Sequence, residues 1–374
     1  MLMREVTDLL DTWYAPAWAD SWDAVGLVCG DPDAAVRRVL LAVDPAPAVV
    51  DEALEWGADL VVVHHPLFLQ GVHGVAADTP KGRTLHRLLT GGCGLFTAHT
   101  NADAPALGVN ESLARAVGVV EPAVIDPDDR PALDKLVVFV PREAADALRT
   151  ALAEAGAGSL GDYDACSFST EGEGRFRPRE GAAPTIGRVG DLETVPETRV
   201  EVVLERGRRA AVLAAMRAAH PYEEVAHDLV ELANPAPGEP TRGTGRIGDL
   251  AEPVSLREFA AQVARALPEC AHGVRVGGDP DRVVRRVAVT SGAGDFLLER
   301  VLETDADVYL TSDLRHHRAG EFLEHGGPAL VDVAHWAAEW TWLPVLAERL
   351  AATVGPALET RVSTTVTDPW TFRA

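Results

Sequence analysis

Residues 59–66 read DLVVVHHP, a short run of β-branched residues that ends in two histidines and a proline. A strand with no polar position is typical of one that is buried on both faces. Residues 39–47 (VLLAVDPAP) and 94–103 (GLFTAHTNAD) have the same character, and stretches with helical spacing at 48–56 and 82–90 separate the three. This alternation predicts βαβ units and a mostly parallel sheet.

The last third of the chain has the same plan. Its expected strands are 283–292, 307–313 and 328–335, its expected helices are 294–303, 315–325 and 336–352, and 361–370 is expected as a final edge strand. We therefore predict an α/β protein in which two lobes with mostly parallel sheets face each other.

The middle of the chain differs, because its strands at 133–141, 198–205 and 225–232 alternate apolar and polar residues. Such strands are typical of an antiparallel sheet with one exposed face. With two intervening helices they predict an inserted α+β module of the ferredoxin-like type, while 157–187 shows no clear helix or buried strand. The expected domains are residues 1–130, the first lobe, residues 131–245, the module, and residues 246–374, the second lobe.

Composition excludes several classes of function. The 374 residues include 34 Lys and Arg against 57 Asp and Glu, a net charge of −23 that repels phosphate backbones and disfavours nucleic acid as a partner. No window approaches the roughly 18 uncharged apolar residues that span a bilayer. Arg4, Glu5 and Asp8 interrupt the place of a signal-peptide core. The four cysteines are far apart, which fits a reducing cytoplasm, so we expect a cytoplasmic protein without a membrane partner.

Side chains of metal-binding types follow four of the expected strands. They are His64 and His65, His99 with Asp103, Asp313, and His335. In open α/β sheets, ligands bind outside the carboxyl ends of the strands, so these side chains are predicted to share one edge. Each signal also has a structural alternative, since a histidine pair can end a buried strand and residues 99–103 can form an Asx turn or a helix N-cap.

His335 and Glu339 are four residues apart, which places them on one face of a helix. The pair would offer a nitrogen and a carboxylate to one ion or let the carboxylate bridge two, although such pairs also occur as plain surface interactions. A histidine and carboxylate set suits zinc, iron, manganese or nickel better than a thiolate metal. Two ions about 3.5–4 Å apart would generate hydroxide and stabilise a displacement.

Five segments, in this order, resemble the dinuclear-metal-centre hexameric proteins, a family that includes the type 2 homologues of GTP cyclohydrolase I. They are SWDAVGLVCGD (21–31), VVVHHPLFLQGV (61–72), FTAHTNADA (96–104), TSDLRHHRA (311–319) and LVDVAHWAAEW (330–340). Residues 164–187 and 218–232 resemble the inserted module of the longer members, which is akin to CutA-like and PII-like folds. The HPYEE stretch at 220–224 is its most specific part.

The resemblance implies two divalent metal ions per chain and a homohexamer. It carries the ligand roles to His64, His65, Asp103, His335 and Glu339, with Glu339 bridging the ions. His99 and His317 become candidate catalytic residues. For His99 a hydrogen-bonded strand end is an equal alternative, and His316 replaces an aromatic residue beside His317. The HPYEE residues His220 and Tyr222 lie in the module, so they are not expected at the metals.

The expected function is that of a metal-dependent hydrolase, in which a metal-bridged water attacks a small, nucleotide-like substrate. Ring opening of GTP and hydrolysis of a phosphoester would use the same site. The residues themselves do not single out GTP, because the chain has no GxxxxGK[ST] loop. The alternative is a non-catalytic metal-trafficking or regulatory protein whose ions are cargo.

Overall fold

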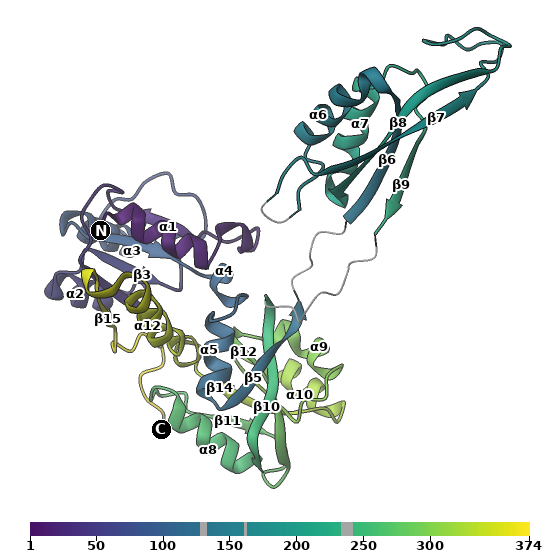
Figure 1. The fold of residues 1–374 in the computed structure, drawn as a ribbon. Helices are drawn as coiled ribbons and strands as arrows, with labels where there is room; N and C mark the ends of the chain where they lie inside the picture. The colour runs from purple at the N-terminus through teal and green to yellow at the C-terminus, as the bar shows by residue number, and fades with distance from the viewer. Residues whose placement is uncertain (128–132, 161–162, 233–241) are drawn as a thin grey trace. The chain divides into compact units, whose positions relative to one another are not determined.

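The computed structural model describes residues 1–127, 133–160, 163–232 and 242–374 (Figure 1). The chain forms two compact units: Met1–Asp128 together with Glu239–Ala374, and Asp129–Gly238. The domain boundary expected at 130 lies outside the described residues. The domain boundary expected at 245 falls within a strand that begins at Gly243. Within the described residues, no helix is long and apolar enough to cross a membrane.

The first sheet of the larger unit has the order β1-β4-β3-β2-β15. Its strands are β1 (Gly26–Cys29), β2 (Arg38–Ala42), β3 (Leu60–Val63), β4 (Gly94–Thr97) and β15 (Glu359–Val362). Only β1 pairs antiparallel, so this sheet is mostly parallel as expected. The edge strand β15 lies near the end of the chain. Only its last two residues, Arg361 and Val362, fall within the expected strand at 361–370, and the rest of that range forms no strand.

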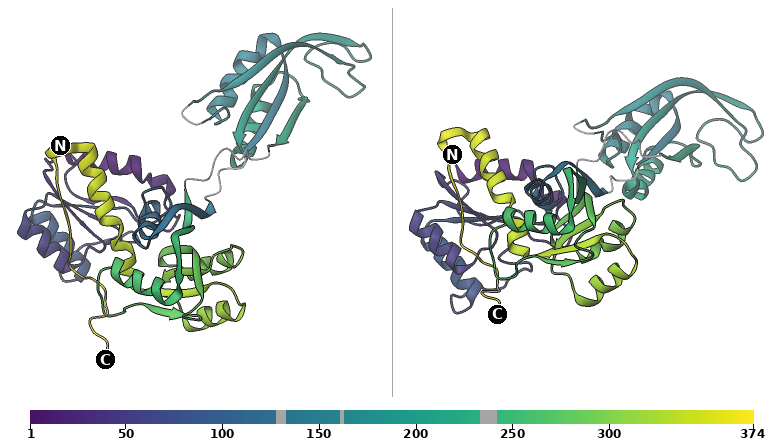
Figure 2. Two further views of the ribbon diagram at one scale, coloured as in Figure 1. Left: turned by 60° about the horizontal axis from the view of Figure 1, so that its bottom comes forward. Right: turned by 90° about the horizontal axis from the view of Figure 1, so that it is seen from below.

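Helices cover both faces of this first sheet. They are α1 (Met3–Trp13), α2 (Pro47–Trp56), α3 (Pro80–Thr90) and α12 (Trp342–Val354). Helices α1 and α12 share one apolar core with the sheet, and α2 and α3 share a second. Figure 2 shows α12, in yellow-green, beside the purple first helix, so segments from near the start and near the end of the sequence pack together.

The second sheet has the order β11-β14-β13-β12-β10-β5. Its strands are β5 (Val119–Pro127), β10 (Gly243–Ser255), β11 (Arg275–Gly277), β12 (Val283–Ala293), β13 (Val308–Ser312) and β14 (Ala329–Val333). Only β12–β13 and β13–β14 pair in parallel, so the expectation of a mostly parallel second sheet is wrong. The chain leaves this sheet along β5 and returns along β10, and neighbouring strands joined in this way run antiparallel, as in a hairpin.

The helices of this second lobe are α5 (Val109–Ala116), α8 (Leu256–Ala266), α9 (Leu298–Leu302), α10 (His316–Glu324) and α11 (His335–Trp340). Helices α5 and α8 pack in one apolar core of the sheet, and α9 and α10 in another. The short helix α11 follows β14 directly and connects the two lobes, since Trp336 belongs to the core of the first and Ala338 to that of the second.

The smaller unit is a four-stranded antiparallel sheet of order β7-β8-β6-β9. Its strands are β6 (Leu133–Pro141), β7 (Ser167–Phe176), β8 (Glu193–Glu205) and β9 (His227–Glu231), and its helices α6 (Ala145–Glu154) and α7 (Arg209–Ala219) share an apolar core with one face. This is the expected alternation of strands and helices. Strand β7 falls in the stretch where none was expected, because it is exposed at almost every position and so lacks an apolar pattern.

Candidate metal centre

Glu339 contacts three of the residues that the sequence predicts as metal ligands. Its side chain is buried, and its Oε1 is 2.8 Å from His335 Nε2 and 3.4 Å from His64 Nε2. Its Oε2 is 3.0 Å from His65 Nε2. Asp103 Oδ1 approaches from the other side, 3.7 Å from His64 Nε2. The structure therefore brings all five side chains together.

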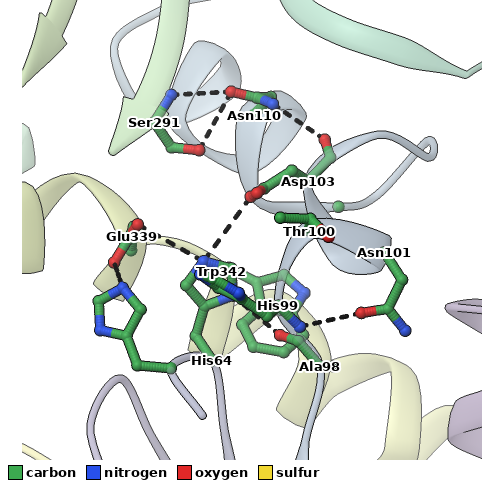
Figure 3. A network of polar contacts seen from close by, with 12 residues as sticks. His64, Ala98, His99, Thr100, Asn101, Asp103, Asn110, Ser291, Glu339 and Trp342 are labelled. Atoms are coloured by element: carbon green, nitrogen blue, oxygen red, sulfur yellow. Dashed lines mark hydrogen bonds and ion pairs between the residues drawn. The ribbon is translucent and has the colours of Figure 1, made fainter. Parts of the chain in front are cut away.

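Three segments supply these side chains at the carboxyl ends of strands. His64 and His65 follow β3, Asp103 ends the short helix α4 (Thr100–Asp103) after β4, and α11 follows β14. Asn110 on α5 fixes α4 against the second sheet, since its Nδ2 donates to the Asp103 carbonyl at 3.0 Å (Figure 3). Its Oδ1 accepts from the backbone N–H of Ser291 at 2.7 Å.

Each of the three histidines has its Nδ1 engaged away from Glu339. The Nδ1 partners are the Ala98 carbonyl for His64 at 2.9 Å, Asp44 Oδ1 for His65 at 2.7 Å and Asp313 Oδ2 for His335 at 2.7 Å. A histidine that donates from one nitrogen has its other nitrogen oriented and made more basic, which is the arrangement of metal-ligating imidazoles. The three Nε2 atoms are thus directed toward a common centre.

The two carboxylates of the cluster are incompletely satisfied. Asp103 Oδ1 is buried without a hydrogen-bond partner among the described residues, and the buried Glu339 Oε2 has only its ion-pair contact of 3.0 Å with His65 Nε2. Burial, and then the charge of Glu339, raises the pKa of Asp103 to about 8. A buried acceptor without a donor is costly, so the pair fits a cation placed between them and the imidazoles.

The imidazoles compensate for Glu339. Burial by itself would raise the pKa of Glu339, but His65, His335 and His64 hold it well below its usual range. Burial would likewise lower the pKa of His65 and His335, yet Glu339 and their Asp partners raise them to about 10 and about 11. Protons on these rings supply the positive charge that a divalent ion would bring, so the donor set fits a metal.

His99 lies beside the cluster. Its ring centroid is 5.1 Å from that of His64 and 5.6 Å from that of His65, and one ligand atom from each of the three lies within 4.8 Å of the others. His65, His335 and Glu339 form a second group whose ligand atoms lie within 4.8 Å of one another. Asp23 Oδ1 accepts from His99 Nδ1 at 2.8 Å. His99 is therefore an oriented imidazole at the edge of the cluster.

His317 is placed elsewhere. It is exposed in the first turn of α10, where its ring lies 5.2 Å from that of His316. Within residues 1–127 and 242–374, no hydrogen bond or ion pair joins it to the Glu339 cluster. The structure thus separates this candidate from the other predicted site residues.

Two residues of the site were not among those predicted. Asp44 follows β2 in the same strand-end position that singled out His64, so the LAVDP pattern contained the signal. Its other oxygen, Oδ2, accepts from the Thr367 hydroxyl. Gly292 has φ +66°, and a Cβ there would lie 2.9 Å from Glu339 Oε1 and 3.3 Å from His335 Nε2. Nothing local distinguishes this glycine from the other glycines of the chain.

A cavity of about 260 Å³ adjoins the cluster. His65 and His335 line it together with Asp44, Asp313 and Asp368. Its remaining wall includes the C-terminal residues Thr367, Pro369 and Trp370. The aspartates give this opening a negative charge, which suits the entry of cations.

The fold and the site define an α/β protein with a candidate metal centre between two lobes, and comparisons with known proteins agree. The chain belongs to the Duf34/NIF3 (NGG1p interacting factor 3) family, whose model matches residues 1–369. A Mycobacterium tuberculosis relative named GTP cyclohydrolase 1 type 2 homolog is 53% identical over 369 residues, which cover 98% of this chain and 96% of the relative. This confirms the resemblance drawn from the five segments.

More distant relatives match most of the chain. A Bacillus subtilis protein of the same name is 38% identical over 334 residues, covering 89% of this chain and 88% of the relative. A crystal structure of a Bacillus cereus protein related to NIF3 matches with a TM-score of 0.67 and 34% identity, covering 100% of this chain and 99% of the other.

Proposed function

We propose that this chain holds two divalent metal ions and acts as a metal-dependent hydrolase. The ligands would be His64, His65, Asp103, His335 and Glu339, with Glu339 between the two ions. The observation that carries this proposal is the convergence of these side chains around the buried carboxylate of Glu339 and around Asp103 Oδ1, which is buried without a hydrogen-bond partner among the described residues. Zinc, iron, manganese and nickel all suit the nitrogen and oxygen donors. When bound, such ions supply Lewis acidity and lower the pKa of a water.

The chain's own residues orient this chemistry. Asp44 and Asp313 fix the rings of His65 and His335 through their Nδ1 atoms. Asp23 does the same for His99, whose other ring nitrogen is then available to accept or give a proton beside the cluster. His317 receives no part in this proposal because it is exposed on α10.

The proposed substrate is a small, nucleotide-like molecule. Relatives that carry the name GTP cyclohydrolase 1 type 2 homolog support GTP as the first compound to test, and phosphoesters as the second. The three aspartates that line the adjoining cavity favour the other candidate, a metal-trafficking or regulatory protein, because they would attract a cation that is cargo.

We further propose a cytoplasmic homohexamer built from domains 1–130, 131–245 and 246–374, whose middle domain is CutA-like and PII-like. Family membership supports the assembly, and the order β6, α6, β7, β8, α7, β9 supports the middle domain. The four cysteines are unpaired, as a reducing compartment would leave them.

The metal content of the purified chain tests this proposal. We expect about two ions per chain by elemental mass spectrometry, in protein prepared without a metal-binding tag. Turnover of GTP or a phosphoester that a chelator abolishes would establish the hydrolase. Bound metal without turnover of either substrate would favour the trafficking alternative. No bound metal after zinc, iron and manganese are added back would contradict both.

The Gly292→Ala substitution is expected to weaken metal binding about ten-fold or more, because its methyl group would displace Glu339 and His335. Competition with a chromophoric chelator measures the affinity. Gly326→Ala is the matched control: it has φ +68°, nearly the same backbone strain, but its Cβ would meet nothing within 4 Å. Equal metal affinity in the two variants would show that the space at Gly292 has no part in the site.

A further inference from the structure

The smaller unit contains a cavity of about 650 Å³, a size typical of sites for small molecules. It lies between the far ends of β7 and β8, the segment that follows β7, and the HPYEE stretch. Its walls are mainly apolar and include Phe139, Phe176, Pro184, Ile186 and Tyr222. All of these residues belong to one unit, and none is a proposed metal ligand.

The HPYEE stretch holds this cavity together. The Thr185 hydroxyl donates to the Pro221 carbonyl at 2.7 Å, and the Ala183 backbone N–H donates to Glu223 Oε1 at 3.0 Å. His220 Nε2 donates to the Phe139 carbonyl at 2.9 Å, which fixes the stretch to β6. The most specific motif of the module thus shapes a cavity, which accounts for residues that the metal centre does not use.

One carboxylate inside the cavity is nearly buried. Glu197 is 9% exposed, and its Oε1 accepts from the Tyr222 hydroxyl at 3.1 Å. A Cβ at Gly174 would lie 2.1 Å from Glu197 Oε2, so only glycine leaves room for this side chain. A carboxylate can accept about four hydrogen bonds, and in an apolar cavity it requires donors. A ligand with N–H groups would supply them.

Three arginines line the same cavity. Arg175 lies near the end of β7, and Arg177 and Arg179 follow it; all three are exposed residues that line the cavity. No ion pair or hydrogen bond involves their side chains within residues 133–160 and 163–232. A guanidinium presents a planar fork of donors that matches a phosphate or carboxylate. In a chain of net charge −23, these three guanidiniums form a local group of cations at the cavity.

The other charges at the cavity are partly neutralised. Glu171 pairs with Arg142 at 3.2 Å, and Arg199 with Glu201 at 2.9 Å. The side chain of Glu223 accepts a backbone N–H, as described above. Glu173 and Glu224 also line the cavity. Hydrogen bonds from neutral donors leave Glu197 and Glu223 charged, so the three arginines stand beside four carboxylates without a described ion pair, and the positive charge is confined to the arginine segment.

We propose that this cavity binds a small phosphate-bearing heteroaromatic molecule, of which a mononucleotide is the simplest example. The ring packs against Phe176 and Tyr222 and donates N–H groups to Glu197, and the phosphate binds Arg175, Arg177 and Arg179. This site shares no residue with the proposed metal centre. Evidence against the proposed hydrolase activity would therefore leave this proposal unaffected.

Calorimetric titration of the full chain with three probes tests the site. We expect GMP to bind once per chain, and guanosine and inorganic phosphate each to bind at least about ten-fold more weakly, because each makes half of the contacts. The titration is repeated with Glu339→Gln in a chelator, where the metal centre cannot contribute, and GMP binding should persist. Loss of binding there would assign the nucleotide to the metal centre and overturn the proposal.

Two variants locate the binding. Arg177→Ala should weaken GMP binding at least about ten-fold, while Arg188→Ala, which removes the same charge from the same segment but does not line the cavity, should not. Glu197→Gln should weaken guanosine and leave phosphate unchanged. The proposal is wrong if GMP does not bind the wild type at millimolar concentration, if the two arginine variants bind alike, or if phosphate alone binds as tightly as GMP.

Discussion

Glu339→Gln is expected to reduce the metal content from about two ions per chain to less than one. Glu339 approaches His64, His65 and His335 with its two oxygens and is the only predicted ligand that reaches all three. Glutamine keeps the shape of the side chain but removes the negative charge and one of the oxygen donors. Elemental mass spectrometry after gel filtration measures the loss.

A second glutamate provides the matched control for this result. Glu52 lies on α2 of the first lobe, outside the cluster. Its Oε2 accepts hydrogen bonds from the hydroxyls of Ser363 at 2.6 Å and Thr365 at 2.8 Å. Glu52→Gln should therefore keep its metal. Full metal content in Glu339→Gln would contradict the bridging role. The carboxylate of Glu339 would then have a structural role instead.

Trp342→Ala is expected to lower the free energy of unfolding by about 3–5 kcal/mol, the cost of emptying a buried aromatic site. Trp342 is fully buried in the core shared by α1, α12 and the first sheet. Its Nε1 donates to the Tyr14 hydroxyl at 3.1 Å, and its ring meets that of Tyr14 edge-on with centroids 5.5 Å apart. The same ring lies 5.8 Å from that of His64, so the cavity would open beneath a proposed ligand.

Denaturant unfolding, followed by circular dichroism, measures this change. Trp370→Ala is the control, since that side chain is 67% exposed and its removal should cost within about 0.5 kcal/mol. Trp342→Phe should lie between the two, because it fills most of the space but leaves the Tyr14 hydroxyl without its donor. Similar costs for Trp342→Ala and Trp370→Ala would show that the core does not depend on this contact.

The buried strands of the larger unit could be predicted because their pattern is local. The cores of β2, β3 and β4 are continuous apolar runs, and each lies within an expected strand. The exposed strand β7 and the long strands β5 and β10 could not be predicted in this way. Residues of β7 face solvent almost throughout, and β5 and β10 take their pairing from the return of the chain after the module.

The candidate site was predicted in part. The strand-end pattern pointed to His64, His65, His99, Asp103 and His335, because the carboxyl ends of strands are where such sheets bind ligands, and the spacing of four residues added Glu339. The same pattern overlooked Asp44, which has the same position after β2, whereas His317, which is exposed on α10, came from the family resemblance alone. A family motif places a residue in a segment, but only its contacts show which way its side chain points.

The sequence by itself determined the class of fold, the inserted module and the residues that could bind metal, because apolar periodicity and residue type are properties of short segments. Only the tertiary structure decided which Glu339 oxygen each histidine faces, that the Nδ1 atoms of His64, His65 and His335 are held by Ala98, Asp44 and Asp313, and that Gly292 leaves room for the cluster. These facts depend on contacts between segments that are far apart in the sequence. The packing of the two sheets through α11 and α12 brings those segments together, and no local sequence pattern encodes the distances between them.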